Sequence, residues 1–167
     1  SRGDLVTKLL LGPVLACVVT ASSFAQSPNW TRVQPAVSPI ARGYHCMSYD
    51  SDRQVIVLFG GRDAVINRLA DTWEYDGKAW KEIKPVVSPS AREDHLMVYD
   101  SVRKVTVLFG GLMQRDTWTW DGVVWTKVRI PPAQKPSARS SFSMAFDEAR
   151  GKTVLFGGYD VSKGLVD

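Results

Sequence analysis

The chain has 167 residues, of which 44% are hydrophobic and 23% are charged, and its formal net charge at pH 7 is +4. This composition is typical of a folded globular domain and excludes an intrinsically disordered chain. The basic residues are interspersed with acidic ones, so the charge pattern does not favour a nucleic-acid partner.

Residues 1–25 differ from the rest and predict a secretory signal peptide. Arg2 and Lys8 precede an apolar run at residues 9–19, and small residues occupy the minus-three and minus-one positions of a cleavage site after Ala25. The apolar run is too short to predict a membrane span. We therefore expect a secreted or periplasmic protein with no membrane span.

The two cysteines predict no intrachain disulfide in the mature chain. Cys17 lies in the leader, so Cys46 would be alone after cleavage, and we expect it to be a small buried apolar residue. Residues 14–17 loosely resemble a lipoprotein processing box. The alternative that they leave open is a lipid anchor at Cys17.

After the leader, the chain repeats itself with a period of 45 to 50 residues. An aromatic-Asp pair, then an apolar run ending in two glycines, occurs three times, and an Asp-Thr-Trp segment with a later Trp follows twice. The aromatic-Asp pairs are residues 49–50, 99–100 and 146–147; the glycine motifs are 57–61, 107–111 and 154–158; the Asp-Thr-Trp segments are 71–77 and 116–122, followed by Trp80 and Trp125.

Each complete repeat predicts four short antiparallel strands and no helix, which in the first repeat are residues 45–49, 55–59, 72–75 and 80–83. An Asp-Gly pair, Asp76-Gly77 or Asp121-Gly122, predicts a tight hairpin between the third and fourth strands. Between the first and second strands, the turns at residues 50–53, 100–103 and 147–150 begin with Asp. We expect the side chain of that Asp to accept hydrogen bonds from turn amides.

These elements predict one all-β domain over residues 26–167. It comprises a stray fourth strand at residues 28–35, a complete unit at 43–84, a second unit at 93–129 and half of a third at 140–158. The glycine pair after an apolar strand, followed by an aromatic residue and a later Trp, resembles the kelch repeat of β-propeller proteins, as in the central domain of galactose oxidase.

The kelch resemblance covers residues 28–158 and implies a ring of four-stranded blades, commonly six or seven. About two and a half blades are present, so we expect an N-terminal fragment of a larger ring, in which the stray strand would complete the last blade. The alternative is self-association through the open blade edges, with several copies completing one ring.

In such a blade, the loop between the second and third strands and the connection between blades lie on one face, which we name the loop face. Its loops vary, since residues 62–70 form a nine-residue loop and the equivalent residues 112–115 only four. This suggests ligand contact there; simple tolerance of loop-length change is the alternative. The candidate binding residues are Arg42, Tyr44, Arg62, Asp63, Asn67, Arg68, Arg92, Glu93, Asp94, Arg115 and Arg139.

Residues that recur in every repeat are expected to serve the fold, because a binding site on a ring needs different groups from different blades. The recurring residues are Gly60, Gly110 and Gly157, Trp73 and Trp118, and Asp71 and Asp116. We expect the Trp rings to fill the wedge between blades and the glycines to permit close backbone approach.

Two recurring sets leave alternatives open. Arg42, Arg92 and Arg139 would either line the mouth of a central channel and hold a carboxylate or phosphate, or bond to carbonyl groups of a neighbouring blade. His45 and His95 share a position that holds Phe142 in the third repeat. This aromatic replacement favours packing over a metal site.

The sequence contains no recognisable catalytic motif, and we expect no cofactor or metal. The predicted function is an exported binding module that recognises a protein or a carbohydrate through the loop face. The alternative implied by the resemblance is a carbohydrate-active propeller enzyme, similar to sialic-acid epimerase or galactose oxidase, in which the three recurring arginines grip a sugar carboxylate. Nothing here specifically reproduces the copper ligands and Tyr-Cys crosslink of galactose oxidase.

Overall fold

The computed structural model describes residues 30–167, and every strand lies within residues 34–167. The predicted signal peptide and Cys17 lie outside the described residues. The described residues are all-β, as the strand pattern predicts, with antiparallel sheets, one short 3-10 turn η1 (Pro132–Gln134) and no α-helix. Within this part of the chain, none of the elements is a helix with the length and apolarity needed to span a membrane.

The first repeat forms a four-stranded sheet, named the first sheet. Its strands, in spatial order, are β2 (Cys46–Asp50), β3 (Val55–Phe59), β5 (Thr72–Tyr75) and β6 (Trp80–Ile83). The predicted bounds of the last three strands are confirmed, and β2 begins and ends one residue later than predicted. Because side chains alternate along a strand, Val57 and Phe59 lie on one side of this sheet.

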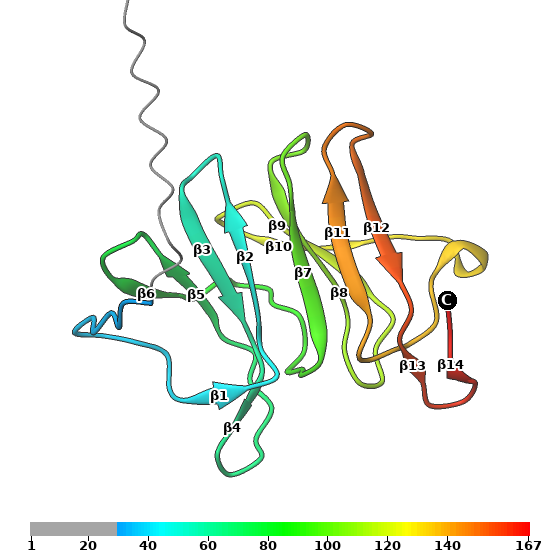
Figure 1. The fold of residues 1–167 in the computed structure, drawn as a ribbon, viewed down its shortest axis with the longest axis horizontal. Coiled ribbons are helices and arrows are strands. Elements are labelled where there is room, and N and C mark those ends of the chain that lie inside the picture. The colour runs from blue at the N-terminus through cyan, green and yellow to red at the C-terminus, as the bar shows by residue number, and fades with distance from the viewer. Residues whose placement is uncertain (1–29) are drawn as a thin grey trace, which may run out of the picture. The chain divides into compact units, whose positions relative to one another are not determined.

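The second repeat forms an equivalent second sheet, and the third repeat contributes a hairpin. The second sheet comprises β7 (His95–Asp100), β8 (Val105–Gly110), β9 (Thr117–Trp120) and β10 (Trp125–Val128), and the hairpin comprises β11 (Ser143–Asp147) and β12 (Lys152–Phe156). The first strands of the three repeats are neighbours, with β2 beside β7 and β7 beside β11 (Figure 1). The described residues do not close into a ring.

A short ladder in the first repeat and an isolated bridge in the third connect the segment before a first strand to the loop that follows a glycine pair. In the first repeat, β1 (Arg42–Gly43) pairs with β4 (Arg62–Asp63). In the third, β13 (Tyr159–Asp160) pairs with β14 (Gly164–Leu165), and Tyr159 exchanges backbone hydrogen bonds with Ser140. These ladders fix the geometry of the loop face.

The predicted turn chemistry is confirmed at both hairpins. Asp50 Oδ1 accepts the amides of Asp52 and Arg53 at 3.1 and 3.0 Å, Asp100 accepts the equivalent two amides, and Asp147 accepts that of Arg150. At the other hairpin, Gly77 and Gly122 have φ values of 91° and 98°, the left-handed conformation that the Asp-Gly pairs predict.

The hydrophobic core lies between the first two sheets. Its largest buried side chains include Trp120 and Trp125 of the second sheet. The Trp125 indole N–H donates to Thr72 Oγ1 at 2.9 Å, and its ring packs edge-on against Phe59 with centroids 5.2 Å apart. The Trp120 ring is fully buried and lies 5.3 Å from that of Trp125. The buried indole N–H of Trp125 thus has a hydrogen-bond acceptor, which avoids most of the free-energy cost of burying a polar group.

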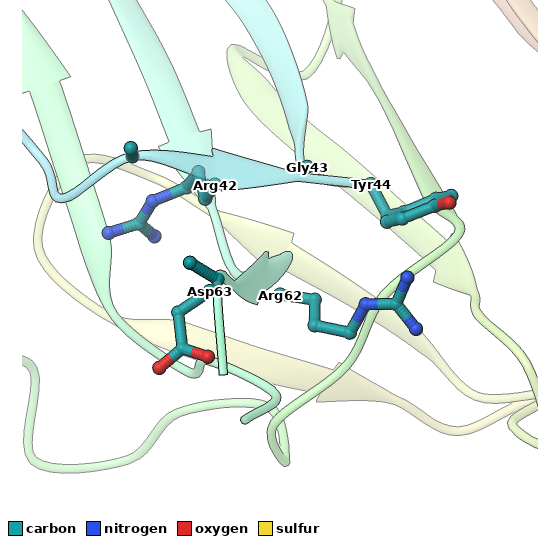
Figure 2. Close-up of a pocket in the computed structure, with 7 residues that line it drawn as sticks. Arg42, Gly43, Tyr44, Arg62 and Asp63 are labelled. Atoms are coloured by element: carbon teal, nitrogen blue, oxygen red, sulfur yellow. The ribbon is translucent and has the colours of Figure 1, made fainter. Parts of the chain in front are cut away.

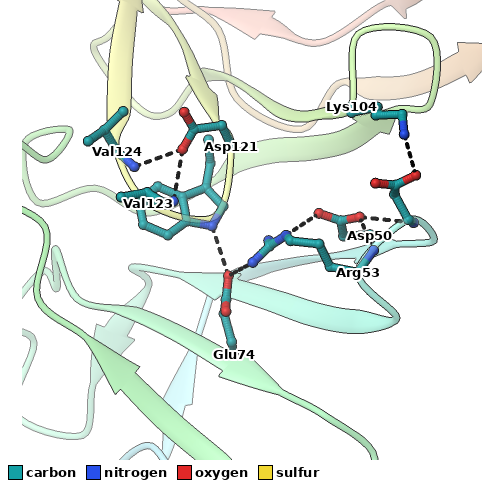
Figure 3. Close-up of polar contacts among 9 residues, drawn as sticks. Asp50, Arg53, Glu74, Lys104, Asp121, Val123 and Val124 are labelled. Atoms are coloured by element: carbon teal, nitrogen blue, oxygen red, sulfur yellow. Dashed lines mark hydrogen bonds and ion pairs between the residues drawn. The ribbon is translucent and has the colours of Figure 1, made fainter.

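A polar network closes the same interface near the turn that follows β2 (Figure 3). Glu74 Oε1 accepts the Trp120 indole N–H at 3.0 Å and Arg53 Nη1 at 2.7 Å, and Arg53 also pairs with Asp50 at 2.8 Å. The Arg53 guanidinium lies against Gly122, where an added Cβ would be 2.6 Å from Nη1. The half-buried carboxylate of Glu74 thus holds groups from both sheets.

The prediction that Trp73 and Trp118 fill the wedge between sheets is correct for only one of them. Trp118 is buried in the core between the first two sheets. Trp73 occupies the equivalent face of the first sheet, which no described sheet covers, and is half-buried. Trp120 and Trp125, which the sequence did not single out as wedge residues, are buried more completely than either.

The first glycine pair permits close backbone approach, but the approach is to the neighbouring repeat and not, as was predicted, between strands of one sheet. A Cβ at Gly60 would lie 2.8 Å from the Arg92 carbonyl oxygen, and the Gly61 amide donates to that oxygen at 2.9 Å. Arg92 therefore joins the second sheet to the end of β3. Residues 30–35, where a stray strand was expected, form no strand in the described chain.

Candidate binding face

Two of the three recurring arginines, Arg42 and Arg92, form ion pairs inside their own repeats. Arg42 forms a bidentate pair with Asp71, with distances of 2.6 and 2.7 Å, and donates to the Gly60 carbonyl at 3.0 Å. Arg92 repeats this arrangement, donating to Asp116 Oδ1 at 2.8 Å and to the Gly110 carbonyl at 2.9 Å.

A tryptophan completes each arrangement. The indole N–H groups of Trp73 and Trp118 donate to Asp71 and Asp116 at 2.7 and 2.8 Å. Burial alone would raise the pKa of Asp116, but the hydrogen bonds from Arg92 and Trp118 outweigh it and lower that pKa to about 2. The first and second repeats therefore each contain an Arg-Asp-Trp triad in which the carboxylate is charged.

These contacts correct the interpretation of the arginines as an anion-binding mouth. The side chains of Arg42 and Arg92 are only 3% and 1% exposed. Arg139 is buried too and donates to the Gly157 carbonyl at 2.8 Å. The alternative, bonding to backbone carbonyls, is right in kind, but the carbonyls belong to the same repeat and not to a neighbouring one.

Tyr44 and Arg62 form the exposed part of the loop face. The Arg62 guanidinium lies over the Tyr44 ring, 4.5 Å from its centroid, and Tyr44 remains 55% exposed. Figure 2 shows these two side chains extending together from the β1–β4 ladder while Arg42 is directed the other way. A hollow of about 270 Å³ is lined by Arg42, Tyr44, Arg62 and Asp63, among others.

A second cavity, of about 160 Å³, lies where the three repeats meet. Its lining includes Tyr44, Asp94 and Ser141. These three residues occupy equivalent positions, since they directly precede His45, His95 and Phe142. All three have positive φ, between 54° and 58°, a conformation that non-glycine residues rarely adopt. Since every repeat shares this backbone, the kink belongs to the fold, while its side chains bring an aromatic ring, a carboxylate and a hydroxyl to one cavity.

Glu93 links loops of two repeats beside this cavity. Its buried carboxylate pairs with Arg62 at 3.3 Å and with Arg68 at 3.1 Å. Burial, followed by the charge of Glu93, raises the pKa of Asp94, and Arg62 and Arg68 act in the opposite direction. The face therefore carries both charge signs side by side rather than a single-sign field.

Two other predicted residues serve the loops themselves. Asp63 accepts the amides of Val65 and Asn67 and the Asn67 side-chain amide, at 2.8 to 3.1 Å, so it shapes the loop after β4. In the third repeat, Asp160 binds Ser162 in a similar way. Arg115 is exposed at the short loop of the second repeat, away from the residues lining the cavity.

His95 packs as an aromatic residue, as Phe142 does at the equivalent position. His95 meets Phe59 edge-on with centroids 5.6 Å apart, and Phe142 meets Phe109 at the same distance. Burial, assisted by the charge of Arg92, lowers the pKa of His95 to about 3, so the ring is neutral at pH 7. Residues 30–167 contain no group of three potential metal-ligating side chains.

A groove along the first strands was not predicted. It has a volume of about 410 Å³ and is lined by residues of β2, β7 and β11, including Met47 and Tyr49. Its lining includes consecutive residues of β2 and of β7, so the period-two alternation of a single strand does not reveal it. Cys46 is half-buried beside it, accepting the Met97 amide at 3.1 Å, and burial raises the pKa of its thiol, in keeping with the predicted packing role.

No protein family and no curated protein matches the chain. We therefore infer function from the residues of the loop face themselves.

Proposed function

We propose that the chain is an exported β-propeller of the kelch type and that its loop face is a non-catalytic binding site for a carbohydrate. Support for the fold comes from the repeated antiparallel sheets with neighbouring first strands. The leader sequence supports export to a secreted or periplasmic location.

The observation that carries the carbohydrate proposal is the grouping of Tyr44, Asp94 and Ser141 around one cavity. A sugar ring has apolar C–H faces that pack on an aromatic ring and hydroxyl groups that donate to a carboxylate. The mixed charges of Arg62, Arg68 and Glu93 suit a neutral polar ligand better than a strongly charged one. A protein is the other candidate ligand for a non-catalytic binding site on this face.

The enzyme alternative has less support. Its sugar-carboxylate grip relied on Arg42, Arg92 and Arg139, whose guanidinium groups are buried and engaged inside the repeats. Asp94 is the carboxylate that lines the cavity. The neighbouring carboxylate, Glu93, forms ion pairs with Arg62 and Arg68. This arrangement supports binding rather than acid-base catalysis.

A glycan array probed with the full chain tests the proposal. We expect signal on a defined subset of neutral glycans and its loss in the Tyr44→Ala variant, since the exposed ring supplies the packing surface. Absence of signal on every glycan would reject the carbohydrate assignment, and signal that survives in Tyr44→Ala would reject the assigned site.

A further inference from the structure

Asp94 carries a carboxylate that forms no contact of its own with the rest of the fold. Between residues 30 and 166, every other aspartate side chain accepts a hydrogen bond or joins an ion pair. Within the described residues, the Asp94 carboxylate does neither, although it is half-buried and lines the cavity of about 160 Å³. A carboxylate that loses hydration without gaining a partner is unfavourable for folding.

Neighbouring repeats enclose Asp94 on both sides. It belongs to the second repeat, whose first strand β7 lies between β2 and β11. The Asp94 amide donates to the Tyr44 carbonyl of the first repeat at 3.1 Å, and Ser141 of the third repeat lines the same cavity. The φ value of Asp94 is 58°, close to the 56° of Tyr44 and the 54° of Ser141. The fold therefore fixes the backbone that carries this carboxylate.

The charges around Asp94 favour a neutral ligand that donates hydrogen bonds. Its neighbour Glu93 forms ion pairs with Arg62 and Arg68 at 3.3 and 3.1 Å. With Asp94 ionised, two carboxylates balance two guanidinium groups, so a cationic ligand group would add an uncompensated charge. Burial and then the charge of Glu93 raise the pKa of Asp94, as expected for a carboxylate that lacks donors. Hydroxyl groups supply such donors without adding charge.

We propose that Asp94 accepts hydrogen bonds from two adjacent hydroxyl groups of the ligand and so restricts it to sugars with a free vicinal diol. The two oxygens of a carboxylate accept in parallel, which suits hydroxyl groups on neighbouring ring carbons. Tyr44, which lines the same cavity, offers the aromatic face on which the C–H groups of that ring pack. This specificity rests on the proposed carbohydrate site and names the class of sugar that the site takes.

Ligand-observed NMR titrations of the full chain with the methyl pyranosides of glucose, galactose and mannose test the diol requirement. The 3-deoxy form of each sugar has no two hydroxyl groups on adjacent ring carbons, whereas the 6-deoxy form keeps its adjacent pairs. We expect the 3-deoxy form of a bound sugar to lose affinity at least about tenfold and the 6-deoxy form to bind as the parent sugar does. Equal affinity for the 3-deoxy form and the parent sugar would overturn the proposal.

The Asp94→Asn variant removes the charge and one acceptor, and asparagine tolerates the left-handed backbone at this position. We expect the variant to lose affinity for the parent sugar at least about tenfold and to bind the parent and 3-deoxy forms alike, because the group that distinguishes them is gone. Asp52→Asn is the matched control, since Asp52 lies in the turn after β2 and does not line the cavity. This control should bind as the unmodified chain does.

Stability in urea separates a ligand contact from a structural role. Asp94→Asn should leave the unfolding midpoint unchanged or raise it, whereas Asp116→Asn, which breaks the ion pair with Arg92, should lower it. A lower midpoint in Asp94→Asn would overturn the proposal.

The binding results also separate this proposal from the carbohydrate site on which it rests. If Tyr44→Ala abolishes sugar binding and Asp94→Asn does not, the site stands and the diol assignment is wrong. If the unmodified chain binds none of the three parent sugars, both proposals are wrong.

Discussion

Arg92 and Asp116 form a buried ion pair, 2.8 Å from Nη1 to Oδ1, that ties the segment before β7 to the start of β9. Trp118 donates to the same carboxylate. The first repeat contains the same arrangement with Arg42, Asp71 and Trp73. A repeated ion pair of this kind indicates a structural unit of the repeat rather than a ligand site.

Replacing Arg92 should destabilise the fold strongly. In Arg92→Ala, the Asp116 carboxylate loses its ion-pair partner and the Gly110 carbonyl loses its donor, so we expect a loss of roughly 3 to 5 kcal/mol in unfolding free energy. Urea denaturation followed by tryptophan fluorescence measures this. Arg115→Ala, at an exposed position, is the control and should change stability by less than about 0.5 kcal/mol. Comparable losses in both variants would contradict the triad.

The His95→Phe variant should flatten the pH dependence of stability. The folded-state pKa of His95 is about 3, against 6.5 for the free side chain, so the unfolded chain takes up a proton between these values that the folded chain does not. Stability therefore falls as pH falls through this window. Phe reproduces the packing of Phe142 without a titratable group. Denaturation at pH 7 and pH 4.5 should show a smaller difference in the variant; an equal difference would count against burial of a neutral His95.

Trp120→Ala should cost more than Trp73→Ala. Trp120 is fully buried between the sheets and holds Glu74, so its loss should cost about 3 to 5 kcal/mol. Trp73 is half-buried on a face that no described sheet covers, so its loss should cost clearly less. Thermal unfolding of both variants checks the order, and the reverse order would mean that the face bearing Trp73 is the main core.

Gly122→Ala and Gly77→Ala separate steric from backbone effects. Both glycines have left-handed φ, which costs a non-glycine residue about 1 to 2 kcal/mol. At Gly77 an added Cβ meets nothing within 4 Å, whereas at Gly122 it meets Arg53 Nη1 at 2.6 Å. We expect Gly122→Ala to be the more destabilising in urea, because Arg53 must leave Glu74. Equal costs would show that Arg53 moves freely.

The strands were predictable because their ends carry local chemistry. Asp76-Gly77 and the turn after Asp50 each fix a hairpin within a few residues, and Val55–Phe59 is an apolar run bounded by such turns. The loop face was predictable in outline, since strand parity alone places Tyr44 and Asp94 at one end. Pairing between loops, such as Arg62 with Glu93, depends on three-dimensional geometry that no local pattern encodes.

The role of the arginines was predictable in principle but was not predicted. Arg42 and Arg92 recur together with Asp71 and Asp116, and joint recurrence of opposite charges is a signal of pairing within the repeat. The sequence did not show that Trp120 is buried more completely than Trp73. This difference depends on which face of a sheet receives a neighbour, and strand alternation does not specify that.

The central claim is that the loop face binds a sugar through Tyr44. Calorimetric titration with a glycan identified on the array tests it most directly, using Tyr49→Ala as the matched control, because Tyr44 and Tyr49 are both 55% exposed but lie at opposite ends of the first-strand segment. We predict that Tyr44→Ala raises the dissociation constant at least about tenfold, equivalent to a loss of roughly 1.4 kcal/mol in binding free energy. Tyr49→Ala should leave the dissociation constant unchanged. Unchanged affinity in Tyr44→Ala, or equal weakening in both variants, would contradict the claim.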